Sequence, residues 1–328
     1  MPFMDKNIDK KIKALLVSNY KLDYSDYFPT SGMHFGNVEF VMDASEDIDA
    51  VVICNHPTQV IKANVAPDNI FHIHQEPGDK LYHGFMFDKV VGQKCGHLPL
   101  TDITSHPCLN WLVNKTYDQL VNLDTSLASI LPMKNKLFSG VISGHNALNG
   151  HYFRLKILEQ IKQQFSIDLY GKRHNFIPDK WDALFPYQFS LAMENSAQTD
   201  YWTEKIMDCF LSCCLPVYYG CTNIDQYFPK QSYIKLDVNN LNYSLGELRE
   251  KLSQEYFIEN YNYLLEARDL CLNKYATAPG LSNIVTSHFT EAPKQQLIMK
   301  PFKRSPLTDI KRKLTRNRIA HWITDKQR

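Results

Sequence analysis

The chain has 328 residues, of which 44% are hydrophobic and 12% aromatic, enough to fill the cores of about two domains. This composition excludes collagen-like, low-complexity and disordered chains. The net charge of +1 is unevenly spread, because residues 294–328 hold eleven of the 36 Lys and Arg but only two of the 35 Asp and Glu. An acidic globular body is therefore expected to end in a strongly basic tail.

The longest apolar run, residues 209–219, is too short to span a bilayer, which needs ~20 residues. The N-terminus lacks the apolar stretch of a signal peptide. We therefore expect a cytoplasmic protein without a transmembrane anchor. The eight cysteines include no Cys-x-x-Cys pair, so free buried thiols are favoured over a zinc site.

Short apolar segments ended by Asn, His or Pro predict strands in the first part of the chain, at 14–18, 50–54 and 70–74. From about residue 136 the pattern becomes a regular alternation of strands and helices. The predicted strands are 137–143, 166–170, 187–193, 215–219 and 232–236, and the predicted helices cover 153–165, 201–214 and parts of 245–275. Strand–helix–strand alternation at this spacing predicts a parallel α/β sheet.

The change of pattern near residues 130–136 divides the chain into three parts. Residues 1–135 are expected to form one α/β domain, residues 136–290 a second, and residues 291–328 a basic amphipathic tail. Two such domains place ligands in the cleft between them, beyond the strand ends.

The most informative stretch is residues 189–220. A strand runs into Glu194-Asn195-Ser196, and Asp200 is the predicted N-cap of a helix beginning near Tyr201. Lys205 then lies in the first turn, where a cation opposes the helix dipole unless it binds an anion there. Glu204 beside it offers oxygens to a ribose or sugar hydroxyl. The alternative is a solvated turn on a surface helix.

Arg154 lies in the helix after the Gly- and Asn-rich loop 144–150. Its planar guanidinium suits the oxygens of a diphosphate. Taken alone, the spacing favours an ordinary surface arginine on an amphipathic helix.

His72, His74 and Glu76 end a predicted strand, on one face if the alternation persists. Three interpretations stay open: a satisfied polar strand end, a catalytic carboxylate, or a metal site of two histidines and a glutamate. Asp47 and Asp49 form an Asp-x-Asp pair of the kind that holds a divalent cation, although such pairs are common by chance.

Taken together, residues 187–220 resemble the donor-binding signature of the α-1,3-fucosyltransferases, glycosyltransferase family 10. The matching residues are Tyr187, Phe189, Glu194-Asn195-Ser196, Tyr201, Thr203-Glu204-Lys205, Pro216-Val217 and Gly220, followed by Asn223-Ile224 and Tyr227-Phe228-Pro229. Two weaker pieces are similar to the family as well. Arg154 stands at the family's distance before a strand that ends in Gly171, and Gln75-Glu76-Pro77 is similar to the bacterial setting of the family's general base.

The resemblance implies a GT-B fold, two facing Rossmann-like domains with a cleft between them. The C-terminal domain would bind a GDP-sugar through Arg154, Asn195, Tyr201, Glu204 and Lys205, and the N-terminal domain would bind the acceptor. The resemblance also implies inverting transfer with Glu76 as the general base and no required divalent metal.

The resulting hypothesis is an enzyme that moves L-fucose from GDP-fucose to a glycan containing N-acetylglucosamine or glucose, in α-1,3 linkage. The alternatives are transfer of another GDP-linked deoxyhexose, or an inactive protein that binds glycans or nucleotides. No aromatic-interleaved basic surface is found in the body, so nucleic acid is not an expected partner.

Within the basic tail, residues 294–328, the apolar side chains between Ser305 and Thr324 gather loosely on one side of a predicted helix. This pattern is typical of a helix that lies on an anionic membrane surface. It predicts peripheral binding to the inner face of the membrane, where lipid-linked glycans would be built. A tail packed on the body, or an unstructured tail, are the alternatives.

Overall fold

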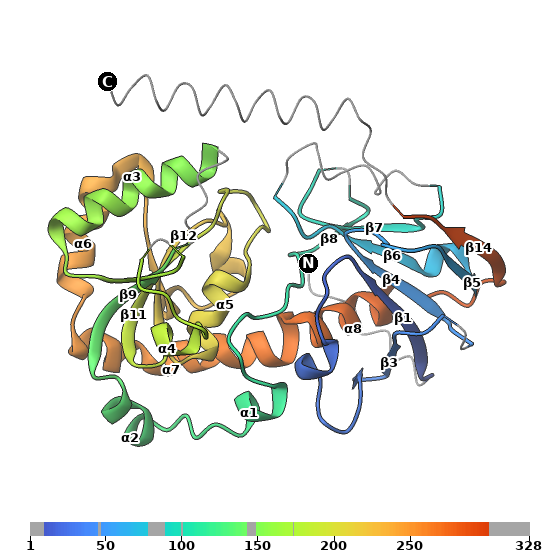
Figure 1. Ribbon diagram of the computed structural model, residues 1–328, viewed down its shortest axis with the longest axis horizontal. Helices are drawn as coiled ribbons and strands as arrows, with labels where there is room; N and C mark the ends of the chain where they lie inside the picture. The colour runs from blue at the N-terminus through green and yellow to red at the C-terminus, as the bar shows by residue number, and fades with distance from the viewer. Residues whose placement is uncertain are drawn as a thin grey trace.

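The computed structural model describes residues 10–44, 47–77, 89–99, 101–142, 149–172 and 174–301, without the side chains of residues 149–153. These residues form two α/β halves that lie side by side, as Figure 1 shows. Within this part of the chain, no helix is both long and apolar enough to cross a membrane.

The N-terminal half is built on a seven-stranded sheet with the order β2-β3-β1-β4-β6-β7-β8. All its pairs are parallel except β2 with β3. Every residue of the central strand β4 is buried, as expected for a parallel strand covered on both faces. The strands are β1 (Ile12–Ser18), β2 (His34–Phe35), β3 (Val38–Val41), β4 (Ala50–Cys54), β6 (Ile70–Ile73), β7 (Gln93–Gly96) and β8 (Ile103–Thr104).

The C-terminal half contains a five-stranded, wholly parallel sheet with the order β10-β9-β11-β12-β13. Two predicted strands, residues 187–193 and 215–219, have the predicted bounds. The strands are β9 (Lys136–Val141), β10 (Asp168–Tyr170), β11 (Tyr187–Met193), β12 (Leu215–Tyr219) and β13 (Ile234–Lys235).

Helices cover both sheets, and most of them belong to the C-terminal half. In α3 the side chains of Ile157, Leu158 and Ile161 are buried, which is the apolar face predicted from their spacing. The helices are α1 (Tyr117–Val121), α2 (Leu127–Ile130), α3 (Asn149–Gln164), α4 (Trp181–Leu184), α5 (Glu204–Leu211), α6 (Leu241–Lys251), α7 (Gln254–Leu270) and α8 (Thr277–His288). A π-helical segment, Cys271–Tyr275, joins α7 to α8.

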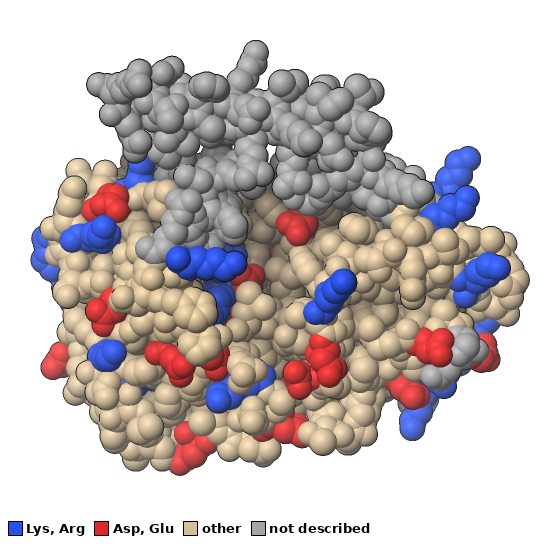
Figure 2. Space-filling model, viewed as in Figure 1, with Lys and Arg blue, Asp and Glu red and all other residues tan. Residues whose placement is uncertain are grey.

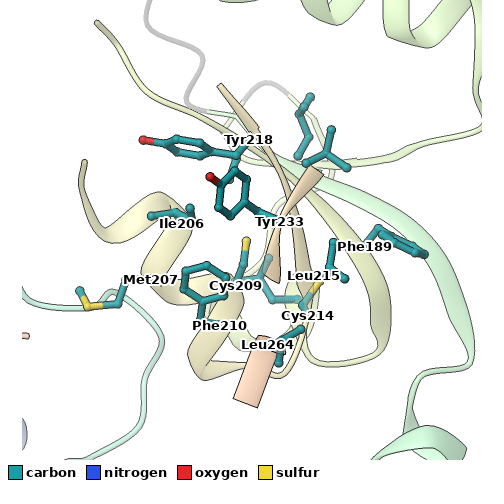
Figure 3. Close-up of a cluster of buried hydrophobic side chains, with 14 of the residues drawn as sticks. Phe189, Ile206, Met207, Cys209, Phe210, Cys214, Leu215, Tyr218, Tyr233 and Leu264 are labelled. Carbon is teal, nitrogen blue, oxygen red and sulfur yellow. The ribbon is translucent and has the colours of Figure 1, made fainter. Parts of the chain in front are cut away.

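The short helix α5 is fixed by packing against β11, β12 and α7 (Figure 3). Six of its eight residues are buried, and Phe210 is completely enclosed. Burying a side chain of this size contributes ~1.5–3 kcal/mol, so packing holds a helix too short to be stable alone. This matters for function because the first residues of α5 belong to the candidate site described below.

The chain returns to the N-terminal half after residue 276. The side chains of Leu281 and Val285 in α8 are completely buried in the core of the first sheet. Beyond α8, strand β14 (Gln295–Met299) pairs antiparallel with β5 (Ile61–Val65). The predicted domain boundaries need correction here, because the second domain was expected to run to residue 290 and the tail to begin at 291. Residues 277–299 instead pack with the first half, since their apolar side chains complete its core.

The remainder of the predicted tail, residues 302–328, lies outside the described residues, so its membrane role stays a prediction. Figure 2 shows acidic and basic side chains interspersed over one face of both halves. Of the tail's eleven basic residues, Lys294 and Lys300 are described, and Lys294 pairs with Asp47 at 3.0 Å and Asp49 at 3.4 Å.

Candidate active site

A cleft of about 310 Å³ is lined by residues from both halves of the molecule. The N-terminal half contributes Tyr20 and Gln75-Glu76, which follow the carboxyl ends of β1 and β6. The C-terminal half contributes a second set of polar side chains, from the end of β11 and the start of α5: Asn195, Tyr201, Thr203, Glu204 and Lys205. Five of the six residues predicted from the sequence therefore meet at one cleft.

Glu76 is half-buried, and its Oε1 accepts a hydrogen bond from the hydroxyl of Tyr20 at 3.1 Å. Burial and the neighbouring Glu76 raise the pKa of Tyr20, so this phenol stays a hydrogen-bond donor. The preceding Gln75 is held through its backbone N–H, which donates to Asn55 Oδ1 at 3.1 Å. Among the described residues, no hydrogen-bond donor lies on the other carboxylate oxygen of Glu76. Together with the anchored backbone, this suits Glu76 to accept a proton at the cleft.

The predicted alternation through residues 72–76 is wrong, because β6 ends at Ile73. His72 is buried, and one ring nitrogen lies 2.7 Å from the carbonyl oxygen of Asn55. Throughout the described residues, no group of three His, Cys, Asp or Glu side chains is placed to hold a metal ion. The Asp-x-Asp pair is instead occupied by lysines, because Asp49 pairs with Lys10 at 3.5 Å as well as with Lys294.

Helix α5 begins later than the sequence indicates. Its N-cap is Thr203, whose hydroxyl accepts from the backbone N–H of Lys205, rather than the predicted Asp200. The carboxylate of Asp200 is engaged elsewhere, since it accepts hydrogen bonds from Tyr227 at 2.7 Å and Asn223 at 2.8 Å. Residue 200 also has a φ of 60°, outside the extended region typical of an N-cap. Glu204 and Lys205 are therefore the first two residues of the helix.

The ammonium group of Lys205 lies between two carboxylates. Its Nζ is 3.2 Å from Glu194 and 3.1 Å from Glu204, and it donates to the hydroxyl of Thr203 at 2.8 Å. Burial opposes ionisation of Lys205, but the two carboxylates outweigh it and raise its pKa. Burial also opposes ionisation of Glu204, yet Lys205 and Lys180 lower its pKa to about 2. Both groups are thus charged at neutral pH.

Arg154 lies beneath this group, 5% exposed, and is absent from the described residues that line the cleft. Its guanidinium donates to the carbonyl oxygen of Met193 at 3.3 Å. Burial lowers its pKa, while Glu194, Glu204 and Tyr201 act in the opposite direction. An arginine remains charged under these conditions, so it adds positive potential near Glu194 and Glu204.

Two further residues complete the C-terminal wall of the cleft. The side-chain oxygen of Asn195 is buried and has no hydrogen-bond partner among the described residues, so it offers an acceptor to a ligand. Tyr201 is 3% exposed, and its ring centroid lies 4.7 Å from that of His97 in the N-terminal half. The two halves are therefore in direct contact at the candidate site.

His106 stacks on Trp202 behind this wall, with ring centroids 4.4 Å apart. Burial lowers the pKa of His106 from 6.5 to about 3 and that of His72 to about 4. When folding lowers the pKa of a histidine, its contribution to stability is fully present at a pH above the pKa of the unfolded state. That contribution is lost as the pH falls toward the pKa of the folded state. Between pH 6.5 and 4, the free energy of unfolding should therefore fall by up to about 1.4 kcal/mol per pH unit for each histidine.

Urea unfolding at a series of pH values measures this slope. We expect the variant His106→Gln to have a markedly shallower slope, and the exposed His34→Gln to keep the original one. Equal slopes in the wild type and His106→Gln would contradict the assignment.

Residues 131–263 match the family model "Glycosyltransferase family 10 (fucosyltransferase) C-term". These residues form a family 10 glycosyltransferase domain. They contain Arg154 and the whole donor signature, so the resemblance found in residues 187–220 is confirmed.

Related proteins agree with the family 10 assignment. A fucosyltransferase-like protein of Arabidopsis thaliana is 41% identical over 24% of this chain and 16% of its own length. The human 4-galactosyl-N-acetylglucosaminide 3-alpha-L-fucosyltransferase 9 is 30% identical over 38% of this chain and 34% of its own. The chain thus spans about a third or less of the curated relatives it matches. A solved α1,3-fucosyltransferase, 16% identical, superimposes with a TM-score of 0.50 over 89% of this chain and 94% of that one. The fold is accordingly of the GT-B type.

Three residues at the candidate site had no role assigned from the sequence. Thr203 was detectable as an N-cap candidate directly before Glu204-Lys205. Glu194 was visible within the signature, but its pairing with Lys205 depends on how β11 meets α5. Tyr20 has no local signal, because it reaches Glu76 across 56 positions of sequence.

Proposed function

We propose that this protein is an inverting glycosyltransferase that moves L-fucose from GDP-fucose to a glycan hydroxyl in α-1,3 linkage. The acceptor sugar is N-acetylglucosamine or glucose. One observation carries the proposal: a carboxylate from the N-terminal half, Glu76, shares a cleft with Lys205 and Asn195 from the family 10 domain. A solved α1,3-fucosyltransferase with this fold, 14% identical and with a TM-score of 0.50, holds GDP-fucose.

The reaction is a single displacement. Glu76 removes the proton of the acceptor hydroxyl while the hydroxyl oxygen attacks the anomeric carbon of the donor from the face opposite GDP. The bond from that carbon to the diphosphate oxygen breaks, and its electron pair leaves with GDP. Lys205, Arg154 and the N-terminus of α5 stabilise the negative charge that develops on the leaving diphosphate. The configuration at the anomeric carbon is thereby inverted.

The other cleft residues bind the nucleoside part of the donor. Glu204, charged and at the cleft surface, accepts hydrogen bonds from ribose hydroxyls. The unpaired oxygen of Asn195 accepts a further hydrogen bond, and Tyr201 closes the wall of the pocket.

Charge compensation in this proposal comes from Lys205 and Arg154, so no divalent cation is required. The two Asp-x-Asp carboxylates lie in ion pairs with lysines, which makes them poor metal ligands. We expect activity to survive dialysis against EDTA with at most a few-fold loss. Complete loss, restored by Mg²⁺ or Mn²⁺ but not by Na⁺ at equal ionic strength, would contradict this.

The decisive experiment is a panel of GDP-fucose, a second GDP-linked deoxyhexose (GDP-rhamnose) and UDP-galactose against lactose, N-acetyllactosamine and the isomeric type 1 chain. We expect product from GDP-fucose alone, with the linkage assigned by NMR. Transfer of another GDP-linked deoxyhexose would keep the mechanism and change the donor. Binding of GDP with neither transfer nor donor hydrolysis would instead indicate a nucleotide-binding protein.

A further inference from the structure

Lys205 uses every hydrogen-bond donor it has within the protein. An ammonium group carries three N–H donors, and Nζ of Lys205 has three partners, Glu194, Thr203 and Glu204, all within 3.2 Å. A diphosphate that bonds directly to this ammonium group must therefore displace one of them. The three partners differ in how firmly they are held.

Glu194 is the least displaceable partner. It is completely buried, and its carboxylate accepts from the backbone N–H of Thr203 at 2.8 Å and from the hydroxyl of the same residue at 2.7 Å. Its space exists because residue 220 is glycine: a Cβ on Gly220 would collide with the Glu194 side chain. Glu194 is also absent from the described lining of the cleft.

Glu204 is placed differently. Its side chain is 17% exposed and lines the cleft, so a ligand there reaches it directly. When Glu204 leaves Lys205, its carboxylate remains at the cleft and no unpaired charge is left in the core. Release of Glu194 would instead leave a buried carboxylate unpaired. The hydroxyl of Thr203 is fixed as the N-cap of α5. Glu204 is thus the partner that can leave at least cost.

We propose that Glu194 is a positioning residue that holds Lys205 at the start of α5, and that Glu204 is an exchangeable partner that gives up its place on Lys205 to the donor diphosphate. This inference rests on the proposed function. Once released, the Glu204 carboxylate accepts hydrogen bonds from the ribose hydroxyls. These hydrogen bonds replace its lost ion pair with Lys205, but only when the ligand carries a nucleoside. A ligand that consists of phosphates alone displaces Glu204 but offers its carboxylate no new hydrogen bonds.

The exchange predicts opposite effects of one variant on two probes. In Glu204→Gln the competitor for Lys205 is weakened, so inorganic pyrophosphate should bind about 3-fold or more tightly than to the wild type. GDP should bind about 3- to 10-fold more weakly, because the carboxylate for the ribose is gone. Calorimetry with each probe measures both constants. The matched control is Glu247→Gln, which removes a charge from a partly exposed pair with Lys251 on α6 and should change neither constant.

The positioning role of Glu194 is tested with the same probes. Glu194→Gln should weaken GDP and pyrophosphate by a similar factor, about 10-fold, and leave the affinity for guanosine unchanged. Glu194→Asp keeps the charge and should recover part of the loss. If Glu194→Gln fails to fold, Glu194→Asp carries the test, with a smaller but equal loss for the two phosphate-bearing probes.

The outcomes separate this inference from the function on which it rests. A wild-type protein that binds neither GDP nor GDP-fucose overturns the proposed function and the exchange together. A wild type that binds GDP, combined with weaker pyrophosphate binding in Glu204→Gln, overturns the exchange alone. Unchanged affinity of Glu194→Gln for both phosphate-bearing probes overturns the positioning role.

Discussion

Replacing Glu76 with glutamine is expected to lower turnover by ~10²–10⁴-fold, the usual effect of losing a general base. The substitution preserves shape and leaves an amide oxygen to accept from Tyr20. Affinity for GDP should change little, because the cationic groups that we propose hold the diphosphate belong to the other half of the molecule. Initial rates at saturating donor and acceptor, together with calorimetry for GDP, measure the two quantities separately.

A suitable control for Glu76→Gln is Glu39→Gln, an exposed residue on β3 of the same sheet. It makes the same chemical change in the same half and should keep wild-type turnover. Retention of a third or more of the turnover by Glu76→Gln would assign the base to another group.

Alanine at Lys205 is expected to weaken GDP binding by about 10- to 100-fold, since a charge-assisted hydrogen bond contributes ~1.5–3 kcal/mol. Arg154→Ala should have a similar effect through the loss of positive potential beneath the cleft. Lys205→Ala also leaves Glu194 buried without its cation, so the melting temperature should fall as well.

Calorimetry with GDP alone measures the effect of the Lys205 and Arg154 variants on binding, and thermal melting shows whether each variant is folded. Lys162→Ala removes an exposed lysine of α3 that pairs with Glu159, and it should alter neither quantity. A folded Lys205→Ala with wild-type affinity for GDP would exclude the lysine from the donor site.

The strands that could be predicted are mainly central parallel strands, which are rich in apolar residues because both faces of the sheet are covered. β12 is of this kind, and β11 is buried along its whole length although Gln188 and Ser190 interrupt its apolar residues. Strands β2, β3, β5, β7, β8 and β14 were not predicted. The start of α5 was not predictable in the same way. Asp200 is a good N-cap by residue type, but its carboxylate accepts a hydrogen bond from Tyr227, which lies 27 positions away in the sequence. Local propensity was overridden by a tertiary contact.

In the candidate site, too, local features could be predicted from the sequence and tertiary contacts could not. Glu204 and Lys205 could be placed together from sequence, because they are neighbours at a helix start. That Glu76 faces them depends on how the two sheets oppose one another, which no local pattern encodes; only the resemblance to family 10 supplied it. Glu194 shows the same limit, since residues nine positions apart meet there across a strand end and a helix cap.

The return of residues 277–299 to the first half has a consequence for synthesis on the ribosome. Strands β1 to β8 emerge first, yet α8 is translated only after the entire family 10 domain. Until then, the apolar face that α8 covers, including Phe40 and Ile12, stays open to solvent on the nascent chain. The C-terminal half has no such dependence, because its five strands are contiguous in sequence. The C-terminal half, although translated second, can therefore fold first. The N-terminal half completes its core only when α8 has been translated.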